Sequence, residues 1–299
     1  MKNITVVIVT YHTPETIILD CLNSLDKNIK VIIIENSDKF SNEELILSKF
    51  NNVKILCSGE NLGYGAGNNL GLREVKTEYA LILNPDTICD KKFFFNLSNV
   101  INDTNDFSII GCQYLDNSDF MPAGFFNSKK NKEFCKNFKN NKIEDLVKVD
   151  WVTGQSMLIN LKKFQNKKIF DEKFFLYFEE FDLCKSLLAK GENVFSSNKL
   201  KIKHLGFKSS FEEGSVHKKS INRLREWHWM WSTFYFYKKN FSYFYALSKV
   251  MSKLIKAFFK TIFYSVILNQ KEKEKYKYRF LGIYNAILGK PSFFRDNLK

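Results

Sequence analysis

The chain has 299 residues, 44% of them hydrophobic, and a formal net charge of +14 at pH 7. A chain of this length and composition can bury a sizeable core, which excludes a mainly disordered protein. Its longest apolar stretches are too short, or too interrupted by lysine, for the roughly 20 residues that a membrane-spanning helix needs. We expect no signal peptide, because residues 1–9 lack a cleavage site. The 6 cysteines form no CxxC pair, which favours free thiols in a reducing cytosol.

The charge is concentrated in the last third of the chain. Residues 201–299 contain 21 Lys and Arg against 6 Asp and Glu, a balance of +15, whereas residues 1–200 balance at −1. A neutral body with a basic, aromatic carboxyl-terminal third predicts contact with an anionic surface, either lipid or nucleic acid.

Short apolar runs near the start of the chain are typical of strands buried in a parallel sheet. They cover residues 6–9, 31–34, 53–56 and 80–83. Helices are predicted from Glu15 to about residue 26 and from Asn68 to about residue 75. This alternation predicts a doubly wound α/β sheet with right-handed crossovers.

Ligands bind beyond the carboxyl ends of the strands in sheets of this kind. The segments that follow the predicted strands are polar or rich in glycine: residues 10–12, 35–37, 59–67 and 84–86. Because four such segments meet at one edge of the sheet, we expect a binding site there.

Asn84, Pro85 and Asp86 directly follow a buried strand. Mg²⁺ commonly takes one or two carboxylates together with substrate phosphates, so Asp86 is a candidate metal ligand. The same three residues are also favourable for a type I turn, and spacing alone does not separate the two interpretations.

The segment from Gly63 to Asn69 holds three glycines ahead of a predicted helix. Its backbone amides could approach a phosphate or a sugar at the helix start. It is not the dinucleotide-binding fingerprint, since Asn68 replaces the final glycine, and the chain has no P-loop motif. A flexible loop that caps the next helix is an equally good interpretation.

Glu179, Glu180 and Asp182 place three carboxylates at a helix start. The helix dipole favours negative charge there, so a solvated helix end is the ordinary explanation, and a general base in a cleft is the functional one. His204 alternates in phase with Leu200 and Ile202 and is therefore expected to point inward. An inward histidine is more often a core residue than a ligand.

The order of these segments resembles the family 2 glycosyltransferases, and most closely their bacterial rhamnosyltransferase-like branch, over about residues 4–210. The matching segments are residues 6–11, 32–37, 61–69, 83–87, 149–154, 174–184 and 203–204. Each segment alone is weak evidence for the family, but seven such segments in the correct order make the resemblance specific.

The resemblance implies a GT-A fold, a Rossmann-like mixed sheet with helices on both faces, and an inverting enzyme that uses a sugar nucleotide with Mg²⁺ or Mn²⁺. It implies Asp86 and His204 as metal ligands, and Glu180 as catalytic base, with Asp182 as a residue that could share this task. It implies a donor site formed by Thr10, Tyr11, Glu35, Asn61, Gly63, Asn68, Asn84, Trp151 and Gly154. Two positions depart from the family pattern: Asn84 replaces an acid, and Glu180 replaces an aspartate.

Residues 247–268 have the spacing of an amphipathic helix, with Lys249, Lys253, Lys256 and Lys260 within roughly 60° of one another, opposite a phenylalanine-rich face. This pattern predicts a helix in a membrane interface. An aromatic cluster is expected at the headgroup level: Trp227, Trp229, Trp231, Tyr235 and Tyr237. The alternative is that these helices pack on the catalytic domain. Binding to nucleic acid is disfavoured, because a helix with lysines opposite an apolar stripe is poorly suited to lie in a groove of a nucleic acid.

We therefore expect a catalytic domain over residues 1–215 and a basic helical region over residues 216–299, peripheral on the cytoplasmic face of a bacterial plasma membrane. The expected donor is a dTDP- or UDP-linked sugar, with L-rhamnose as a candidate, and the expected acceptor is a lipid-linked sugar or oligosaccharide of a surface polysaccharide. One alternative is a catalytically inactive membrane adaptor of the same fold. A sugar nucleotidyltransferase is disfavoured, since residues 10–14 offer no phosphate-binding glycine loop.

Overall fold

The computed structural model describes residues 3–104, 106–115, 121–140, 142, 144–206, 209–211 and 217–295. The chain forms two compact units. The first consists of Met1–Leu62, Ala66–Phe170 and Leu183–Phe211, and the second of Gly63–Gly65, Asp171–Asp182 and Glu212–Lys299. The expected domain boundary, between residues 215 and 216, lies outside the described residues.

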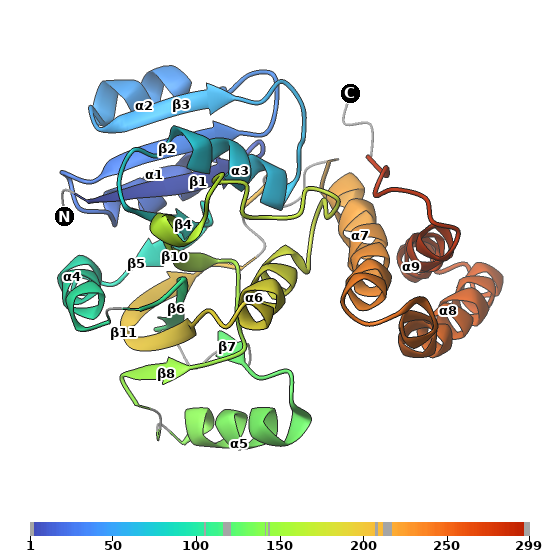
Figure 1. Ribbon diagram of the computed structural model, residues 1–299. Coiled ribbons are helices and arrows are strands. Elements are labelled where there is room, and N and C mark those ends of the chain that lie inside the picture. Colours follow the sequence, from blue (N-terminus) through green and yellow to red (C-terminus); the bar gives the residue numbers. More distant parts are fainter. Residues whose placement is uncertain are drawn as a thin grey trace. The chain divides into compact units, whose positions relative to one another are not determined.

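The first unit is built on a mixed sheet (Figure 1), which has nine strands in the described part of the chain. Its strand order is β3-β2-β1-β4-β10-β6-β11-β5, and β8 also pairs with β11. The strands are β1 (Ile4–Thr10), β2 (Lys30–Glu35), β3 (Val53–Cys57), β4 (Tyr79–Leu83), β5 (Thr87–Cys89), β6 (Ile109–Tyr114), β8 (Leu146–Lys148), β10 (Ser156–Asn160) and β11 (Val194–His204). A separate pair joins β7 (Ala123–Gly124) to β9 (Trp151–Val152).

The four predicted amino-terminal strands all form, and they lie parallel to one another as β3, β2, β1 and β4. Strand β10 then runs antiparallel to both β4 and β6, and β5 and β8 run antiparallel to β11. The sheet is therefore mixed, as expected for the fold class. Because β1, β2 and β4 are parallel, their carboxyl ends lie at the same edge of the sheet.

Helices cover both faces of this sheet. Val6 and Ile8 of β1 face a core shared with α1 (Glu15–Asn23), α2 (Glu43–Lys49) and α4 (Phe93–Asp103). On the other face α3 (Tyr64–Glu74) approaches β1 closely, because a Cβ atom at Gly71 would lie 2.5 Å from Val7 Cγ1. The unit also contains α5 (Ser128–Lys139) and most of α6 (Glu179–Ala189).

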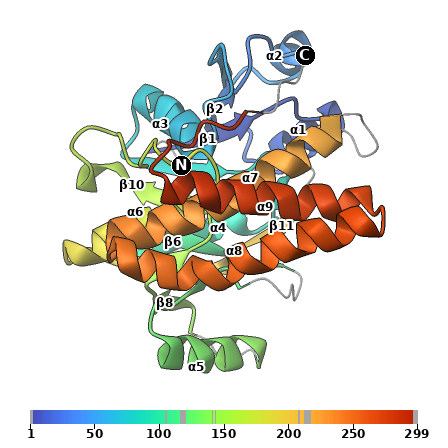
Figure 2. The ribbon, with the colours of Figure 1, turned by 90° about the vertical axis from the view of Figure 1, so that its right-hand side faces the viewer.

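The second unit contains three long helices that lie side by side in Figure 2: α7 (His217–Asn240), α8 (Tyr243–Val266) and α9 (Gln270–Ile287). Their shared core includes Trp227, Phe234, Val250 and Ile283. The segment 171–182 packs on α7, where Ser232 Oγ donates a hydrogen bond to the Leu176 carbonyl oxygen. No helix in the described ranges has the length and apolarity needed to cross a bilayer.

The expected placement of the aromatic cluster at a headgroup level is wrong for its central members. Trp227 and Trp231 are 1% and 4% exposed, and Trp231 Nε1 donates a hydrogen bond to the Lys290 carbonyl oxygen at 2.9 Å. Their spacing of four residues puts both indoles on one side of α7, where they enter the core of the three helices. Trp229 lies elsewhere on α7, is 43% exposed, and packs edge-on against Tyr177.

Candidate functional site

Glu35 is the centre of a hydrogen-bonded cluster at the carboxyl ends of β1 and β2. It is fully buried, and it lies opposite Thr10 in the strand register. Thr10 Oγ1 donates to Oε2 of Glu35 at 2.6 Å, while Ser37 Oγ and the His12 amide donate to Oε1 at 2.7 and 3.1 Å. Three donors offset the cost of burying the carboxyl group, and they fix its orientation.

The loop after β1 is held in a defined conformation. His12 has φ = 47°, in the left-handed region, and its carbonyl oxygen accepts a hydrogen bond from the Phe211 amide at 3.0 Å. Thr13 Oγ1 donates to the Ser209 carbonyl oxygen at 2.7 Å. Residues 209–211 therefore brace the loop that carries the predicted donor-site residue Tyr11.

Tyr11 and Asn61 are brought together in this cluster. Burial raises the pKa of Tyr11, a hydrogen bond from the Asn61 side chain acts in the opposite direction, and the nearby Glu35 carboxylate raises the pKa further. The phenol is therefore neutral near pH 7 and available as a hydrogen-bond donor. The Phe211 ring packs edge-on against it, with ring centroids 5.8 Å apart.

The segment after β4 is a turn that also positions a buried carboxylate. The Thr87 amide donates to the Asn84 carbonyl oxygen at 3.2 Å, which closes the turn, and the Leu205 amide donates to the Asp86 carbonyl oxygen at 2.9 Å. Asp86 is 1% exposed. The turn interpretation and the ligand interpretation of this motif are therefore compatible, because the turn holds Asp86 against the end of β11.

Asp86 and His204 are neighbours, as two candidate ligands of one ion must be. His204 Nε2 lies 3.3 Å from Asp86 Oδ1, and 20% of the His204 side chain is exposed. The pairing of His204 with Thr87 between β11 and β5 brings them together. The described residues contain no group of three or more His, Cys, Asp or Glu side chains placed to hold a metal. A carboxylate and an imidazole fit an ion whose other ligands come from substrate phosphates and water.

The segment that follows β9 lies beside this turn. The Asn84 amide donates to the Gln155 carbonyl oxygen at 2.9 Å, directly after the predicted donor-site residue Gly154. Gly154 is buried, and Trp151 of β9 is partly exposed. The first unit thus joins Asn84, Asp86, Gly154 and His204 in one region.

The predicted glycine loop is instead helical, and this corrects the sequence-based boundary. Helix α3 begins at Tyr64 rather than at Asn68, and the Tyr64 amide already donates to the Phe175 carbonyl oxygen at 3.0 Å. A Cβ atom at Gly67 would lie 2.9 Å from Val9 Cγ1. Gly67 therefore permits close packing of the helix on β1.

The two other predicted residues of this segment have distinct surroundings. Gly63 precedes the helix with φ = +83°, which an L side chain rarely adopts, and a Cβ atom there would lie 2.1 Å from the Phe175 carbonyl oxygen. Asn68 is fully buried. Asn69, next to it, bonds the backbone of Phe170, with Nδ2 donating at 2.9 Å and Oδ1 accepting at 3.0 Å.

The three carboxylates at the start of α6 belong to the second unit, and each has a different environment. Burial raises the pKa of Glu179 well above its usual range, and the neighbouring Glu180 raises it further. Asp182 is 4% exposed, and it accepts from Lys239 Nζ at 2.6 Å and from Asn240 Nδ2 at 2.9 Å. Glu180 is the partly exposed member of the three. Asp182 is therefore occupied by structural contacts.

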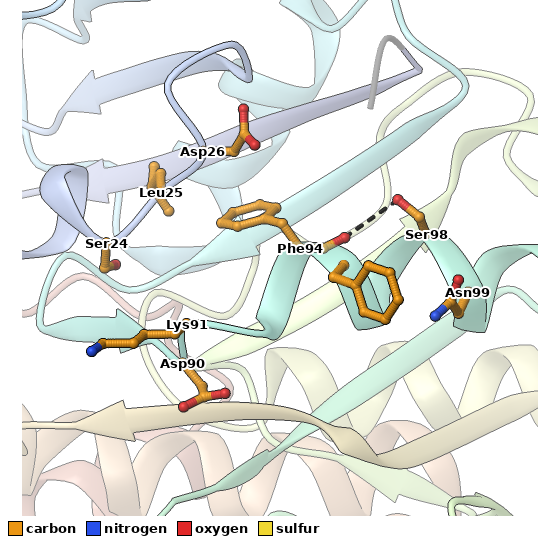
Figure 3. A pocket seen from close by; sticks show the side chains of 9 residues that line it. Ser24, Leu25, Asp26, Asp90, Lys91, Phe94, Ser98 and Asn99 are labelled. Atoms are coloured by element: carbon orange, nitrogen blue, oxygen red, sulfur yellow. Dashed lines mark hydrogen bonds between the residues drawn. The ribbon is translucent and has the colours of Figure 1, made fainter.

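A separate pocket of about 550 Å³ opens between the end of α1 and the start of α4 (Figure 3). Ser24, Asp26, Asp90 and Lys91 contribute its polar lining, and Phe94 contributes an aromatic side. None of the predicted site residues lines it. It is therefore not the site that the sequence motifs indicate.

Sequence reasoning missed two contributors to these clusters. Ser37 donates to Glu35, and its position directly after β2 could have identified it. Lys239 pairs with Asp182 from 57 residues away, and nothing local to either residue predicts this contact.

Comparison with known proteins identifies the family of the chain. Residues 5–174, more than half of the chain, match the model of the glycosyl transferase family 2. The chain is 27% identical over 202 residues to the low-salt glycan biosynthesis hexosyltransferase Agl10 of Haloferax volcanii, covering 65% of this chain and 64% of that protein. It is 26% identical over 212 residues to the rhamnosyltransferase WbbL of Escherichia coli, covering 62% of this chain and 77% of that protein.

Among solved structures, the chain resembles the mannosyltransferase PcManGT from Pyrobaculum calidifontis in complex with GDP-Man and Mn²⁺. The TM-score is 0.53 at 11% identity, over 96% of this chain and 88% of that one. At this identity the likeness shows the fold, which is the GT-A fold. The match to the Haloferax protein spans slightly less than two thirds of that protein's length. On the family match, the chain belongs to glycosyl transferase family 2.

Proposed function

We propose that the chain is an inverting glycosyltransferase that moves a sugar from a nucleoside-diphosphate sugar to a lipid-linked or glycan acceptor. The observation that carries this proposal is the contact of 3.3 Å between Asp86 Oδ1 and His204 Nε2 at the edge of the sheet. Family membership and the two relatives, a hexosyltransferase and a rhamnosyltransferase, support the same reaction class.

The donor would occupy the edge where β1, β2 and β4 end. Glu35, oriented by three hydrogen bonds, would accept from the nucleoside, and Tyr11 and Asn61 would flank it. Asn84, Trp151 and Gly154 would line the sugar side, and Gly63 and Asn68 would shape the start of α3. We favour a dTDP- or UDP-linked sugar, and the rhamnosyltransferase relative makes L-rhamnose a candidate.

Asp86 and His204 would hold Mg²⁺ or Mn²⁺. When bound, such an ion neutralises the charge that gathers on the departing diphosphate. Mn²⁺ is present in the solved mannosyltransferase of the same fold, which supports a divalent ion in this chain. The amide of Leu205 fixes the Asp86 backbone, so the carboxylate is presented by a rigid turn.

We propose Glu180 as the general base, and not Asp182. In the transfer step the acceptor oxygen forms a bond to the anomeric carbon while the bond to the diphosphate breaks. The nucleoside diphosphate leaves with the electron pair, and the acceptor proton passes to the Glu180 carboxylate. Asp182 is unsuited to this task, because Lys239 and Asn240 already bind its two oxygens.

We further propose that residues 1–215 form the catalytic domain and that residues 216–299 support it at a membrane. The protein would then act on the cytoplasmic face of the plasma membrane in surface polysaccharide synthesis. The name of one relative, a hexosyltransferase of glycan biosynthesis, supports a role in glycan synthesis.

Thermal unfolding with dTDP, UDP, GDP or CMP, each with and without Mg²⁺ or Mn²⁺, tests the donor site. A ligand at 100 times its Kd adds about 2.7 kcal/mol, which raises the Tm by roughly 2–4 °C for a chain of this size. We expect a metal-dependent rise with one nucleoside diphosphate. The rise should vanish in Asp86→Ala and persist in Asp103→Ala, an exposed carboxylate at the end of α4. No rise with any nucleotide would favour an inactive adaptor.

A further inference from the structure

Helix α8 has three distinct faces, where the sequence pattern indicated two. At about 100° per residue, Ala246, Val250 and Ala257 fall together, and all three are buried. Ala246 and Val250 belong to the core that the three helices share. The apolar stripe expected from sequence is therefore divided. Its inner part packs within the three helices, and its outer part does not.

The outer part is an exposed apolar band of six residues: Ile255, Phe258, Phe259, Ile262, Phe263 and Val266. Their exposed fractions run from 47% for Phe258 to 76% for Val266. The band continues past the helix end, where Leu268 is 81% exposed and adopts φ = 55°, in the left-handed region. A contiguous patch of large apolar side chains exposed to water marks an interaction surface.

The four lysines of α8 lie along one edge of this band, but they are not equivalent. Lys260 Nζ donates to the Tyr276 hydroxyl at 2.9 Å. Partial desolvation lowers the pKa of Lys253, and the like charge of Arg279 on α9 lowers it further. Lys249, Lys253 and Lys256 are exposed. At about 100° per residue, Lys249 and Lys256 are the two of these that lie nearest the apolar band.

We propose that α8 lies in the plane of an anionic lipid bilayer, with the exposed apolar band in the acyl boundary and Lys249 and Lys256 on the headgroups. An apolar face beside a lysine edge, on a helix that lacks the apolarity to span, is the arrangement of an interfacial helix. Helix α8 has 24 residues and is about 36 Å long, and the exposed apolar band occupies its second half, from Ile255 to Val266.

The charge of the region favours lipid over a second copy of this chain as the occupant. Residues 201–299 balance at +15, so two copies that met through this band would bring two strongly basic surfaces together. An anionic leaflet instead supplies charge of the opposite sign to the exposed lysines.

Flotation of the full chain with vesicles tests this inference. We expect binding to vesicles of phosphatidylcholine with phosphatidylglycerol, and weaker, salt-insensitive binding to phosphatidylcholine alone. The double variant Phe259→Glu, Phe263→Glu should bind at least roughly tenfold more weakly, because two rings no longer enter the acyl boundary. The matched control is Phe95→Glu, which alters a phenylalanine of α4 that is 71% exposed in the first unit.

The double variant Lys249→Glu, Lys256→Glu should lose the preference for anionic lipid and retain the apolar contact. Equal flotation of wild type and the phenylalanine double variant, both with native circular dichroism, would overturn the proposal. So would a wild-type dimer in sedimentation that binds no vesicles and becomes monomeric in the phenylalanine double variant. The inference does not rest on the transfer reaction, because nucleotide binding in solution is measured separately and concerns other residues.

Discussion

The ammonium group of Lys239 lies 2.6 Å from the Asp182 carboxylate and thereby joins the carboxyl-terminal helix α7 to the start of α6. The same ammonium lies 2.8 Å from Asp171, whose second partner on α7 is the Tyr235 hydroxyl. Burial acts to raise the pKa of Asp171, but the hydrogen bonds from Lys239, the Lys173 amide and Tyr235, together with the Lys239 charge, outweigh it and leave the pKa lowered. Helix α7 thus holds both ends of the segment that carries Glu180.

Replacing Lys239 should destabilise this segment. Lys239→Met leaves the Asp182 side chain, 5% exposed, without its counter-ion, while the lysine itself is 37% exposed. A fully buried pair costs 3–5 kcal/mol when broken, so we expect a loss of about 2 kcal/mol in the free energy of unfolding here. Urea denaturation measures it. Lys238→Met, at the adjacent exposed position, should cost far less, and equal losses in the two variants would contradict the assigned role.

Glu180→Gln should mainly lower kcat, whereas Asp182→Asn should mainly lower the free energy of unfolding. We expect Glu180→Gln to lower kcat by about 10²- to 10⁴-fold, the usual contribution of a general base, with the unfolding free energy nearly unchanged. Asp182→Asn should instead lower stability, because it weakens the pair with Lys239. Initial rates and urea denaturation on both variants separate these effects. A folded Asp182→Asn variant with the larger loss of kcat would identify Asp182 as the base.

The strands and the edge site are the parts that sequence alone predicts well. Strands buried on both faces must be apolar throughout, so β1, β2 and β4 stand out as continuous runs. The motif at the end of β4 makes Asp86 a candidate ligand, and alternation in β11 predicts only that His204 points inward. The family resemblance, and not the local pattern, pairs His204 with Asp86, and the two side chains are neighbours in the structure.

Contacts between distant segments could not be predicted in this way. No local sequence pattern indicates the ion pair of Asp182 with Lys239. This pair shows that Asp182, among the carboxylates of the acidic segment, makes structural contacts. Helix α3 begins at Tyr64, inside the glycine-rich segment, and Gly67 permits its close approach to Val9 of β1, which no turn rule anticipates. The division of the apolar stripe on α8 likewise depends on which of its residues the neighbouring helices cover.

Thr10→Val tests the cluster around Glu35. The substitution removes the donor 2.6 Å from Oε2 of a fully buried carboxyl group and keeps the volume of the side chain. We expect a loss of about 1–3 kcal/mol in the free energy of unfolding, together with weaker binding of the nucleoside diphosphate. Thr10→Ser retains the hydroxyl and should behave like wild type. Equal stability of the valine variant would mean that Glu35 does not depend on this bond.

His228 should make the protein less stable in mild acid. The ring is fully buried, Nε2 contacts the Phe294 carbonyl oxygen at 2.8 Å, and burial lowers its pKa to about 3. Below its ordinary pKa of about 6.5 the unfolded chain binds a proton that the folded chain does not. The stability that neutral His228 contributes is therefore present above that pH and is lost as pH falls, by about 1 kcal/mol between pH 6.5 and 5.5.

The measurement compares wild type with His228→Phe, because Glu179 acts in the opposite direction. Its raised pKa stabilises the folded state at low pH, and this stability is lost as pH rises above the ordinary glutamate value. Subtracting the two unfolding curves removes that contribution. A difference that does not change between pH 6.5 and 5.5 would show that His228 titrates normally in the folded protein.

The most direct test of the central claim is release of nucleoside diphosphate from a panel of dTDP- and UDP-linked sugars, with a lipid-linked acceptor and with Mn²⁺ or a chelator. We predict release with one donor, only with metal, together with a glycosylated acceptor of inverted configuration. Asp86→Ala should abolish both products and remain folded, because Asp86 is one of the two proposed metal ligands. Wild-type turnover by folded Asp86→Ala, or metal-independent transfer by the native chain, would contradict the account.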